Sequence, residues 1–453
     1  MASTKFTAAV VAAVLSVGGG TALAQSSGQT ADLARQVEEL RARVAELEGQ
    51  QKAGARDTAR VVEEVLRDAD RRTQLLATGE ELNAGYDDKG FFIASGAFVL
   101  RPAVQFQFRY TLDSRSDTPG GDSQVDDGFE LRRLRFDLAG SAFTPDFAYF
   151  FEVDANRDSG AVTLLEGWGR YMVNKDCGVL FGQFKDPVTH EFVMSTKRQL
   201  LADTSLADAV VGGGVTGYTQ GVMGLYGAYG KDNPWNVIVG ATDGANQANT
   251  NYTGDTNDLP VTAAPPAHSL DYGVTGRVEY KVMGDWSAYS QFTSLGCKND
   301  TLVVGAGADF SQGGGDLLVA TADVQYNLAS GWGFYGAALA KYTEAKLSGL
   351  ADDTTDWGLL AQGSYLFSQR WEAFARGDVT FLDYDVAAAG GEDTFPELTA
   401  GVNYYLRGHK AKITVDVTYL PSGAPAAYTG LGISGTSDGE SEVVLRGQFQ
   451  LLL

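Results

Sequence analysis

The feature that most limits the possible folds is a two-residue alternation of apolar and polar side chains, which starts near Phe91 and continues to the C-terminus. In the segment 272–282, Tyr and Val dominate one face, while Thr, Arg, Glu and Lys occupy the other. The segment 411–419 repeats the pattern with Ile, Val and Tyr opposite Lys, Thr and Asp. Because successive side chains of a β-strand point to opposite faces, the alternation predicts strands with one apolar and one polar surface.

The spacing of the turns favours a membrane barrel over a soluble sandwich. The alternation predicts about sixteen strands. They span residues 97–111, 128–141, 146–154, 163–173, 178–185, 219–229, 235–242, 271–282, 286–296, 316–327, 332–343, 355–367, 371–384, 395–406, 411–420 and 441–453. Short and long connectors alternate, which places the short turns on one rim and the long loops on the other. An even number of antiparallel strands with such connectors is typical of outer-membrane β-barrels. We therefore predict an all-β fold, an antiparallel transmembrane barrel over residues 97–453.

Aromatic residues near the short turns support the membrane interpretation, since rings gather at the membrane interface. The pairs are Phe143 and Phe147, Tyr280 and Trp286, Tyr326 and Trp332, and Phe367 and Trp371. The alternative is that they are core aromatics of a soluble β fold. The same strand order places Cys177 at a short turn and Cys297 at a long loop, on opposite rims and too far apart for a disulfide.

The N-terminal part has a different organisation. Residues 1–24 have the basic residue, apolar run and A-x-A site of a secretory signal peptide. Residues 25–76 predict a short coiled-coil helix, and residues 77–96 a linker. The helix prediction rests on apolar residues spaced alternately four and three apart, namely Leu33, Val37, Leu40, Val44 and Leu47. A solitary amphipathic helix is the alternative.

Composition excludes several classes of function. The chain has 453 residues and a net charge of −22, whereas nucleic-acid binding needs a basic surface. Three scattered histidines and two cysteines give no metal-ligand spacing, so we expect neither a metal site nor a cofactor.

A prediction about pore size concerns the segment 186–218, which follows a strand and is the third long connector. Long connectors without strand pattern are uncommon in compact folds and are often functional. We expect this loop to fold into the barrel and narrow the pore.

Two stretches resemble the phosphate-selective porin family, the porin O and porin P type. One is Phe-Glu-Leu-Arg-Arg-Leu-Arg-Phe-Asp-Leu-Ala-Gly at 129–140, and the other is Gly-Gln-Phe-Lys-Asp-Pro at 182–187, followed by Glu191 and Ser195. The resemblance implies a sixteen-stranded, trimeric outer-membrane barrel whose third long loop folds inward. It also implies arginines along the pore wall and lysines near the constriction.

The candidate pore and selectivity residues follow from the resemblance and from the polar faces of the strands. They are Arg101, Arg109, Arg132, Arg133, Arg135, Lys185, Lys197, Arg198, Asp137, Glu152 and Glu191. Rings of cationic side chains in a lumen favour anions, whereas carboxylates oppose them, and charges paired across strands would be ordinary wall residues. The tandem Arg132 and Arg133 breaks the alternation and predicts a β-bulge.

We therefore predict an outer-membrane porin of a Gram-negative-type bacterium, not an enzyme, that lets small hydrophilic solutes or ions diffuse passively, with anions such as phosphate as candidates. The expected partners are outer-membrane lipid, those solutes and two further copies of the chain in a homotrimer. The helix would lie in the periplasm. One alternative is an envelope-tethering barrel whose coiled coil contacts the cell wall. A second is a barrel hydrolase using His190 and Ser195, which needs a hydrogen-bonded nucleophile and base.

Overall fold

The computed structural model describes residues 38–45, 82–87, 89–116, 124–157, 159–250, 270–348, 351–383, 392–433 and 439–453. The chain divides into two units, Met1–Glu80 and Glu81–Leu453. Within the described ranges, we find no helix with the length and apolar character needed to cross a membrane.

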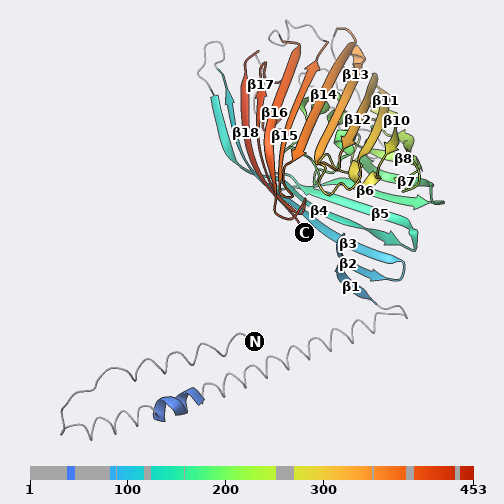
Figure 1. Ribbon diagram of the computed structural model, residues 1–453. Helices are drawn as coiled ribbons and strands as arrows, with labels where there is room; N and C mark the ends of the chain where they lie inside the picture. The colour runs from blue at the N-terminus through green and yellow to red at the C-terminus, as the bar shows by residue number, and fades with distance from the viewer. Residues whose placement is uncertain are drawn as a thin grey trace, which may run out of the picture. The chain divides into compact units, whose positions relative to one another are not determined.

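The second unit is built on a single 18-stranded antiparallel sheet, of which β3 to β18 form a closed ring (Figure 1). The ring strands are β3 (Phe98–Arg115), β4 (Gln124–Ala142), β5 (Thr144–Ala155), β6 (Val162–Met172), β7 (Cys177–Lys185), β8 (Tyr218–Tyr226), β9 (Trp235–Thr242), β10 (Leu270–Met283), β11 (Thr301–Gly313), β12 (Asp316–Asn327), β13 (Trp332–Thr343), β14 (Thr354–Leu366), β15 (Trp371–Phe381), β16 (Thr394–Tyr405), β17 (Ala411–Leu420) and β18 (Glu442–Leu452). β18 pairs with β3 from Glu442 opposite Arg115 to Leu452 opposite Gln105, which closes the ring. The predicted sixteen-stranded barrel is confirmed.

The barrel carries its apolar residues on the outside. On β10, Val274 and Val278 are 54% and 43% exposed, while Thr275, Arg277 and Glu279 between and beside them are buried. A soluble fold would reverse this arrangement, because its apolar side chains would face the core. The lipid solvates the outer face, and the polar inner face pairs its own charges and amides.

One predicted strand is wrong. Residues 286–296 form the short helix α5 (Trp286–Tyr289) and a turn, and the strand after β10 is β11, which lies within the predicted connector 297–315. The segment 284–300 enters the lumen from the short-turn rim, where Trp286, Tyr289 and Phe292 are buried. Alternation in both segments made either a possible strand, and hydrogen bonding to β10 and β12 selects the second.

Two further expectations change with this correction. Trp286 is a lumen residue and is not part of the aromatic belt. Cys297 lies on the short-turn rim with Cys177, so the predicted placement on opposite rims is wrong, and both cysteines are free thiols.

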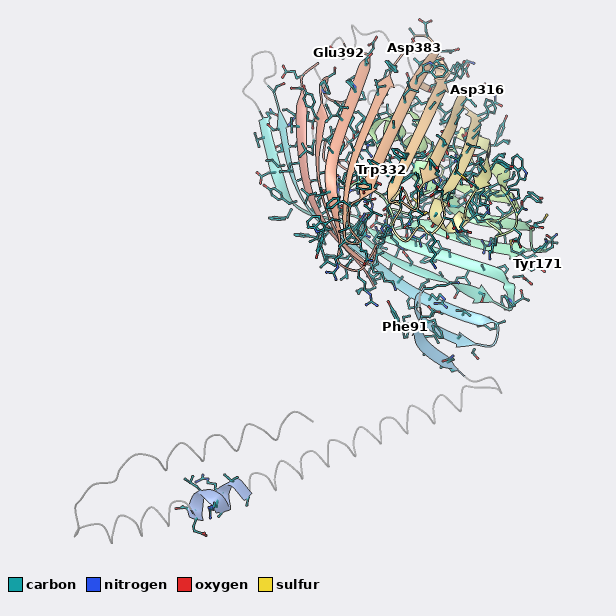
Figure 2. The ribbon with its side chains drawn as sticks, viewed as in Figure 1. Phe91, Tyr171, Asp316, Trp332, Asp383 and Glu392 are labelled. Carbon is teal, nitrogen blue, oxygen red and sulfur yellow. The ribbon has the colours of Figure 1, made fainter. Side chains whose placement is uncertain are left out.

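The rims are distinguished by charge and by aromatic rings. Trp332 stacks on Tyr365 with ring centroids 4.5 Å apart, and Trp371 contacts Tyr404 in a tilted arrangement with centroids 4.7 Å apart, both next to short turns. Figure 2 places Asp316, Asp383 and Glu392 near the opposite rim, at the top of the view. The long loops therefore begin from an acidic rim.

The predicted linker 77–96 contains structure. β1 (Asn83–Asp87) and β2 (Gly90–Ser95) form an antiparallel hairpin, and β2 pairs with the first residues of β3. The hairpin is tied to its surroundings by a bidentate ion pair from Arg101 to Asp87, with a shortest distance of 2.7 Å.

The predicted coiled coil lies mostly outside the described residues, as does the signal peptide. Residues 38–45 are helical, and the seam residues Leu40 and Val44 within them are 63% and 54% exposed.

Candidate functional site

The candidate site centres on residues 186–217, here called the inner loop. It contains α2 (His190–Val193), α3 (Leu206–Val211) and α4 (Gly213–Thr216). Its residues bond to side chains on β3, β4, β12, β15, β16 and β17, which lie around most of the ring. Only a segment inside the barrel can reach all these strands, so the inner loop crosses the lumen.

The local sequence explains where the inner loop leaves the wall. Gly182 has φ +120°, and a Cβ there would lie 2.3 Å from the carbonyl oxygen of Gly167, so glycine is required. β7 ends at Lys185, and Asp186 turns the chain by accepting a bond from the Val188 amide at 3.0 Å. Pro187 then has no N–H with which to continue the ladder.

Two apolar clusters hold the second half of the inner loop. Leu206, Ala207 and Val211 are buried with Leu339 and Phe395 of β13 and β16. A second cluster joins Leu200 and Leu201 of the loop to side chains of β13 to β15 and of the segment 284–300, namely Tyr335, Leu360, Phe374 and Phe292. Burying several such side chains contributes about 1.5–3 kcal/mol each, so this half of the loop is firmly held.

Asp203 of the inner loop gathers three of the predicted arginines. Its carboxylate lies 2.6 Å from Arg109, 2.9 Å from Arg132 and 2.6 Å from Arg133. Burial by itself would raise the pKa of Asp203, but Arg132, Arg133 and Arg109 outweigh it and hold that pKa well below its usual range. Asp203 is therefore ionised at neutral pH, and the arginine cluster compensates its negative charge.

The predicted bulge supplies one of these arginines. Gln107 of β3 pairs with Arg133 and Phe108 pairs with Leu131, so Arg132 is the extra residue on β4. The bulge lets Arg132 and Arg133, neighbours in sequence, both reach Asp203.

A second charge cluster lies on β4 and β5. Arg135 is 3.0 Å from both Glu152 and Asp154. Lys197 of the inner loop forms an ion pair with Asp137 and lies 3.9 Å from Glu152. The structure thus brings together four of the predicted site residues here, with charges of both signs.

A third cluster surrounds Glu191. Its carboxylate accepts bonds from the Ser205 amide at 2.9 Å and the Ser205 hydroxyl at 2.7 Å, and it lies 3.6 Å from Arg376 of β15. Arg376 also donates to the carbonyl oxygens of Asp203 and Thr204, both at 3.0 Å. This cluster fixes the middle of the inner loop to the wall.

We expect the inner loop to loosen as pH rises through neutrality. Burial, with the nearby Asp208, raises the pKa of Glu191 to about 7, from 4.5 in the unfolded chain. A carboxyl with a raised folded pKa stabilises the fold fully below the unfolded pKa and loses that contribution as pH rises through the folded pKa, about 3 kcal/mol for this shift. Single-channel current should therefore show more sub-state transitions at pH 8 than at pH 5.5.

The matched variants for this prediction are Glu191→Gln, which should reduce the pH step in current noise, and Glu344→Gln, which changes a carboxyl paired with Lys346 at the rim and should leave the step in place. A Glu191→Gln channel that keeps the full pH step would contradict the assignment.

The other predicted residues have separate positions. Lys185 donates to the carbonyl oxygens of Phe192 and Met194, at 2.7 Å and 3.3 Å, and so ties α2 to β7. Arg198 bonds to Ser290 of the segment 284–300. Arg101 is bound to Asp87 and does not join the clusters.

Open space remains beside the inner loop, along β5 to β9. A cavity of about 450 Å³ there is lined by wall residues such as Glu166 and Arg170 and by loop residues including Lys197. Two further cavities, of about 640 Å³ and 870 Å³, lead to the short-turn rim. Lys197 lines all three cavities.

Sequence reasoning missed the residues that hold the loop. Asp203, Arg376 and Arg446 were not among the candidates, although Arg446 binds Asp416 at 2.7 Å and Asp416 accepts the Ala202 amide at 3.0 Å. The sequence signal that could have identified Arg376 and Arg446 is a charged residue on the polar, lumen-facing side of a strand, here β15 and β18.

The hydrolase pair is not assembled. The His190 ring stacks on Tyr289 with centroids 4.0 Å apart, and its Nε2 is 2.9 Å from Gln325. The Ser195 hydroxyl instead accepts the Lys197 amide at 3.4 Å.

Comparison with known proteins gives one family. The family model of phosphate-selective porin O and P matches residues 104–421. No curated protein matches the chain.

Solved structures show the same barrel at low sequence identity. An anion-selective porin from Comamonas acidovorans is 13% identical with a TM-score of 0.52, covering 78% of this chain and 100% of that one. The outer membrane channel DcaP of Acinetobacter baumannii is 12% identical with a TM-score of 0.50, covering 79% and 99%. Salmonella typhi OmpF in complex with daunomycin is 13% identical with a TM-score of 0.51, covering 78% and 98%. At this identity the similarity concerns the fold.

Proposed function

The chain belongs to the phosphate-selective porin O and P family and is a passive channel of the outer membrane, and we propose that its solutes pass along β5 to β9 with anions favoured. The observation that carries this proposal is the position of Lys197, which lines all three cavities. Arg198 lines the two cavities nearer the short-turn rim, and Lys185 lines the first.

The arginine cluster on β3 and β4 has another role in this proposal. Asp203 pairs with Arg109, Arg132 and Arg133, and Arg109 and Arg133 are buried. None of these three arginines lines the three cavities, so their field acts on the passage from farther away than that of Lys197, which lines all three although it is paired with Asp137. These arginines hold the inner loop, and the cations beside the cavities set ion preference.

The test is the reversal potential of single channels in a KCl gradient. Lys197→Gln removes the central cation and leaves Asp137 unpaired, so the reversal potential should move toward that of K⁺. Arg101→Gln is the matched control, since Arg101 is bound to Asp87 and lies apart from the cavities. An unchanged reversal potential in Lys197→Gln would refute the proposed role of Lys197 in ion preference. A wild-type protein without conductance would contradict the channel function.

We also propose the assembly that the family suggests, a homotrimer embedded in outer-membrane lipid with the N-terminal helix in the periplasm. The exposed Leu40 and Val44 support helix association, because apolar side chains four residues apart share one helix face. The mass of the detergent-solubilised complex tests this, and a monomer would refute it. Contact of this helix with the cell wall stays a prediction.

A further inference from the structure

The inner wall of this barrel changes character along β5 to β9. Elsewhere the lumen face is polar, as in Gln105, Gln107 and Arg109 of β3 or Thr414 and Asp416 of β17, all buried. Beside the cavity along β5 to β9, it is largely apolar. Six side chains line the 450 Å³ cavity with carbon surface: Phe150, Trp168, Leu180, Phe184, Leu225 and Ile238.

These side chains form one continuous strip. Phe150 and Trp168 are directly opposite each other on β5 and β6, with ring centroids 5.5 Å apart and planes at 31°. Leu180 pairs with Arg170 on the next strand, and Leu225 pairs with Ile238. A water-facing apolar strip costs solvation free energy, so its presence in a lumen calls for an occupant that covers it.

Two cations border the strip without a hydrogen bond to a carboxylate among the described residues. The Nε of Arg170 is buried and has no hydrogen-bond partner. The ammonium of Lys185 is bonded only to two carbonyl oxygens. By contrast, Arg135 and Arg277, which also line the cavity, are each paired with two carboxylates.

The carboxylates at the cavity form no ion pair with Arg170 among the described residues, whereas Glu166 partly offsets the charge of Lys185. Glu152 is bound by Arg135. Glu166 accepts the indole N–H of Trp168 at 3.1 Å, which fixes the ring plane. The arrangement is therefore an oriented aromatic pair next to an unpaired guanidinium, in a volume within the range of small-molecule sites.

We propose that this strip is a binding site for small aromatic carboxylates, whose ring lies on Phe150 and Trp168 and whose carboxylate meets Arg170. The proposal rests on the channel function and specifies which solutes the passage selects. Ring contacts stabilise an aromatic solute over an aliphatic one of equal charge, and a guanidinium forms bidentate bonds with a carboxylate. Binding at the wall would slow such a solute in transit and reduce the ionic current while it is bound.

The test is block of single-channel KCl current by benzoate, with acetate and inorganic phosphate as comparison anions. Benzoate should block at a concentration about tenfold lower than acetate, which is the effect expected of a ring contact. Trp168→Leu and Phe150→Leu should abolish this advantage, and Trp168→Phe should keep most of it. Arg170→Gln should weaken block by benzoate about fivefold or more, as loss of a charged hydrogen bond does.

Matched controls are Trp371→Leu and Arg370→Gln at a short turn, where Trp371 is exposed on the outer face. KCl conductance of each variant reports that the barrel is folded and open.

The outcomes distinguish a failure of the proposed binding site from a failure of the channel function. If the channel conducts KCl normally but benzoate blocks no better than acetate, the binding site is refuted and the porin function stands. If Arg170→Gln weakens block while both ring variants leave it unchanged, the site takes anions by charge alone and the aromatic assignment is wrong. If no variant and no wild-type channel conducts, the channel function itself fails.

Discussion

Replacing Asp203 with Asn should convert the pore into a strongly anion-selective and noisy channel. The carboxylate is shared by Arg109, Arg132 and Arg133, so its loss leaves three cations without their common partner. Removing one member of a buried ion cluster costs about 3–5 kcal/mol, because the remaining charges stay desolvated. The arginines should move toward the water of the lumen, and the loop segment around residue 203 should lose its attachment to β3 and β4.

The measurements are the reversal potential in a KCl gradient and the frequency of current sub-states. Asp87→Asn is the matched control, because it also removes a carboxylate bound to an arginine, at a site apart from the inner loop. If the Asp203→Asn channel keeps both the wild-type potential and the wild-type noise, Asp203 does not hold the arginines in solution.

Removing residues 188–204 and joining the ends with a short Gly-Ser linker should raise single-channel conductance severalfold. This segment carries α2, Lys197 and Leu200, and it occupies the lumen beside all three cavities. The barrel wall keeps every strand ladder, so the variant should still fold. Conductance follows the open cross-section, and the deletion removes the main obstruction in it.

Gly307→Val provides an independent perturbation of the same loop. Gly307 faces the lumen from β11, and a Cβ there would lie 2.2 Å from the carbonyl oxygen of Val188. The substitution should displace the start of the inner loop without removing any part of it, which predicts unstable conductance levels.

If the variant that lacks residues 188–204 has wild-type conductance, the loop does not restrict the pore.

The sequence predicted the barrel well because its signal is repeated and local. Each strand shows the alternation on its own, and the wall has one water-facing and one lipid-facing surface throughout. The failure at 286–296 has a physical reason. Trp286-Ser-Ala-Tyr has apolar residues that fit a strand, yet they fill the lumen under the inner loop, where Tyr289 stacks on His190.

The true strand β11 looked like a loop because it is rich in glycine. Gly305 and Gly307 lack side chains where Arg277 and the backbone of Val188 fill the space. A glycine has no side chain to add to the alternating pattern. Where a neighbouring group requires a glycine, as at these two positions, the strand is therefore hard to recognise from the sequence.

The charged residues of the candidate site could largely be predicted from the sequence, but the ion pairs between them could not. The cationic residues on β4 and the position of the inner loop followed from pattern and resemblance, and the bulge at Arg132 followed from the broken alternation. The role of Asp203 did not. Its partners are 94, 71 and 70 residues away in sequence, and only the path of the loop brings them together.

The strands that hold the inner loop have a consequence for how such a channel can be diversified. Its apolar anchors are on β10 and on β12 to β18, and its polar and ionic anchors include side chains of β3, β4, β15 and β17. Apart from Lys185, the cavity lining on β5 to β9 contributes little to that scaffold. Substitutions of the other lining residues can change which solutes the channel admits while the constriction keeps its shape, which makes these five strands the natural target for library-based engineering of transport.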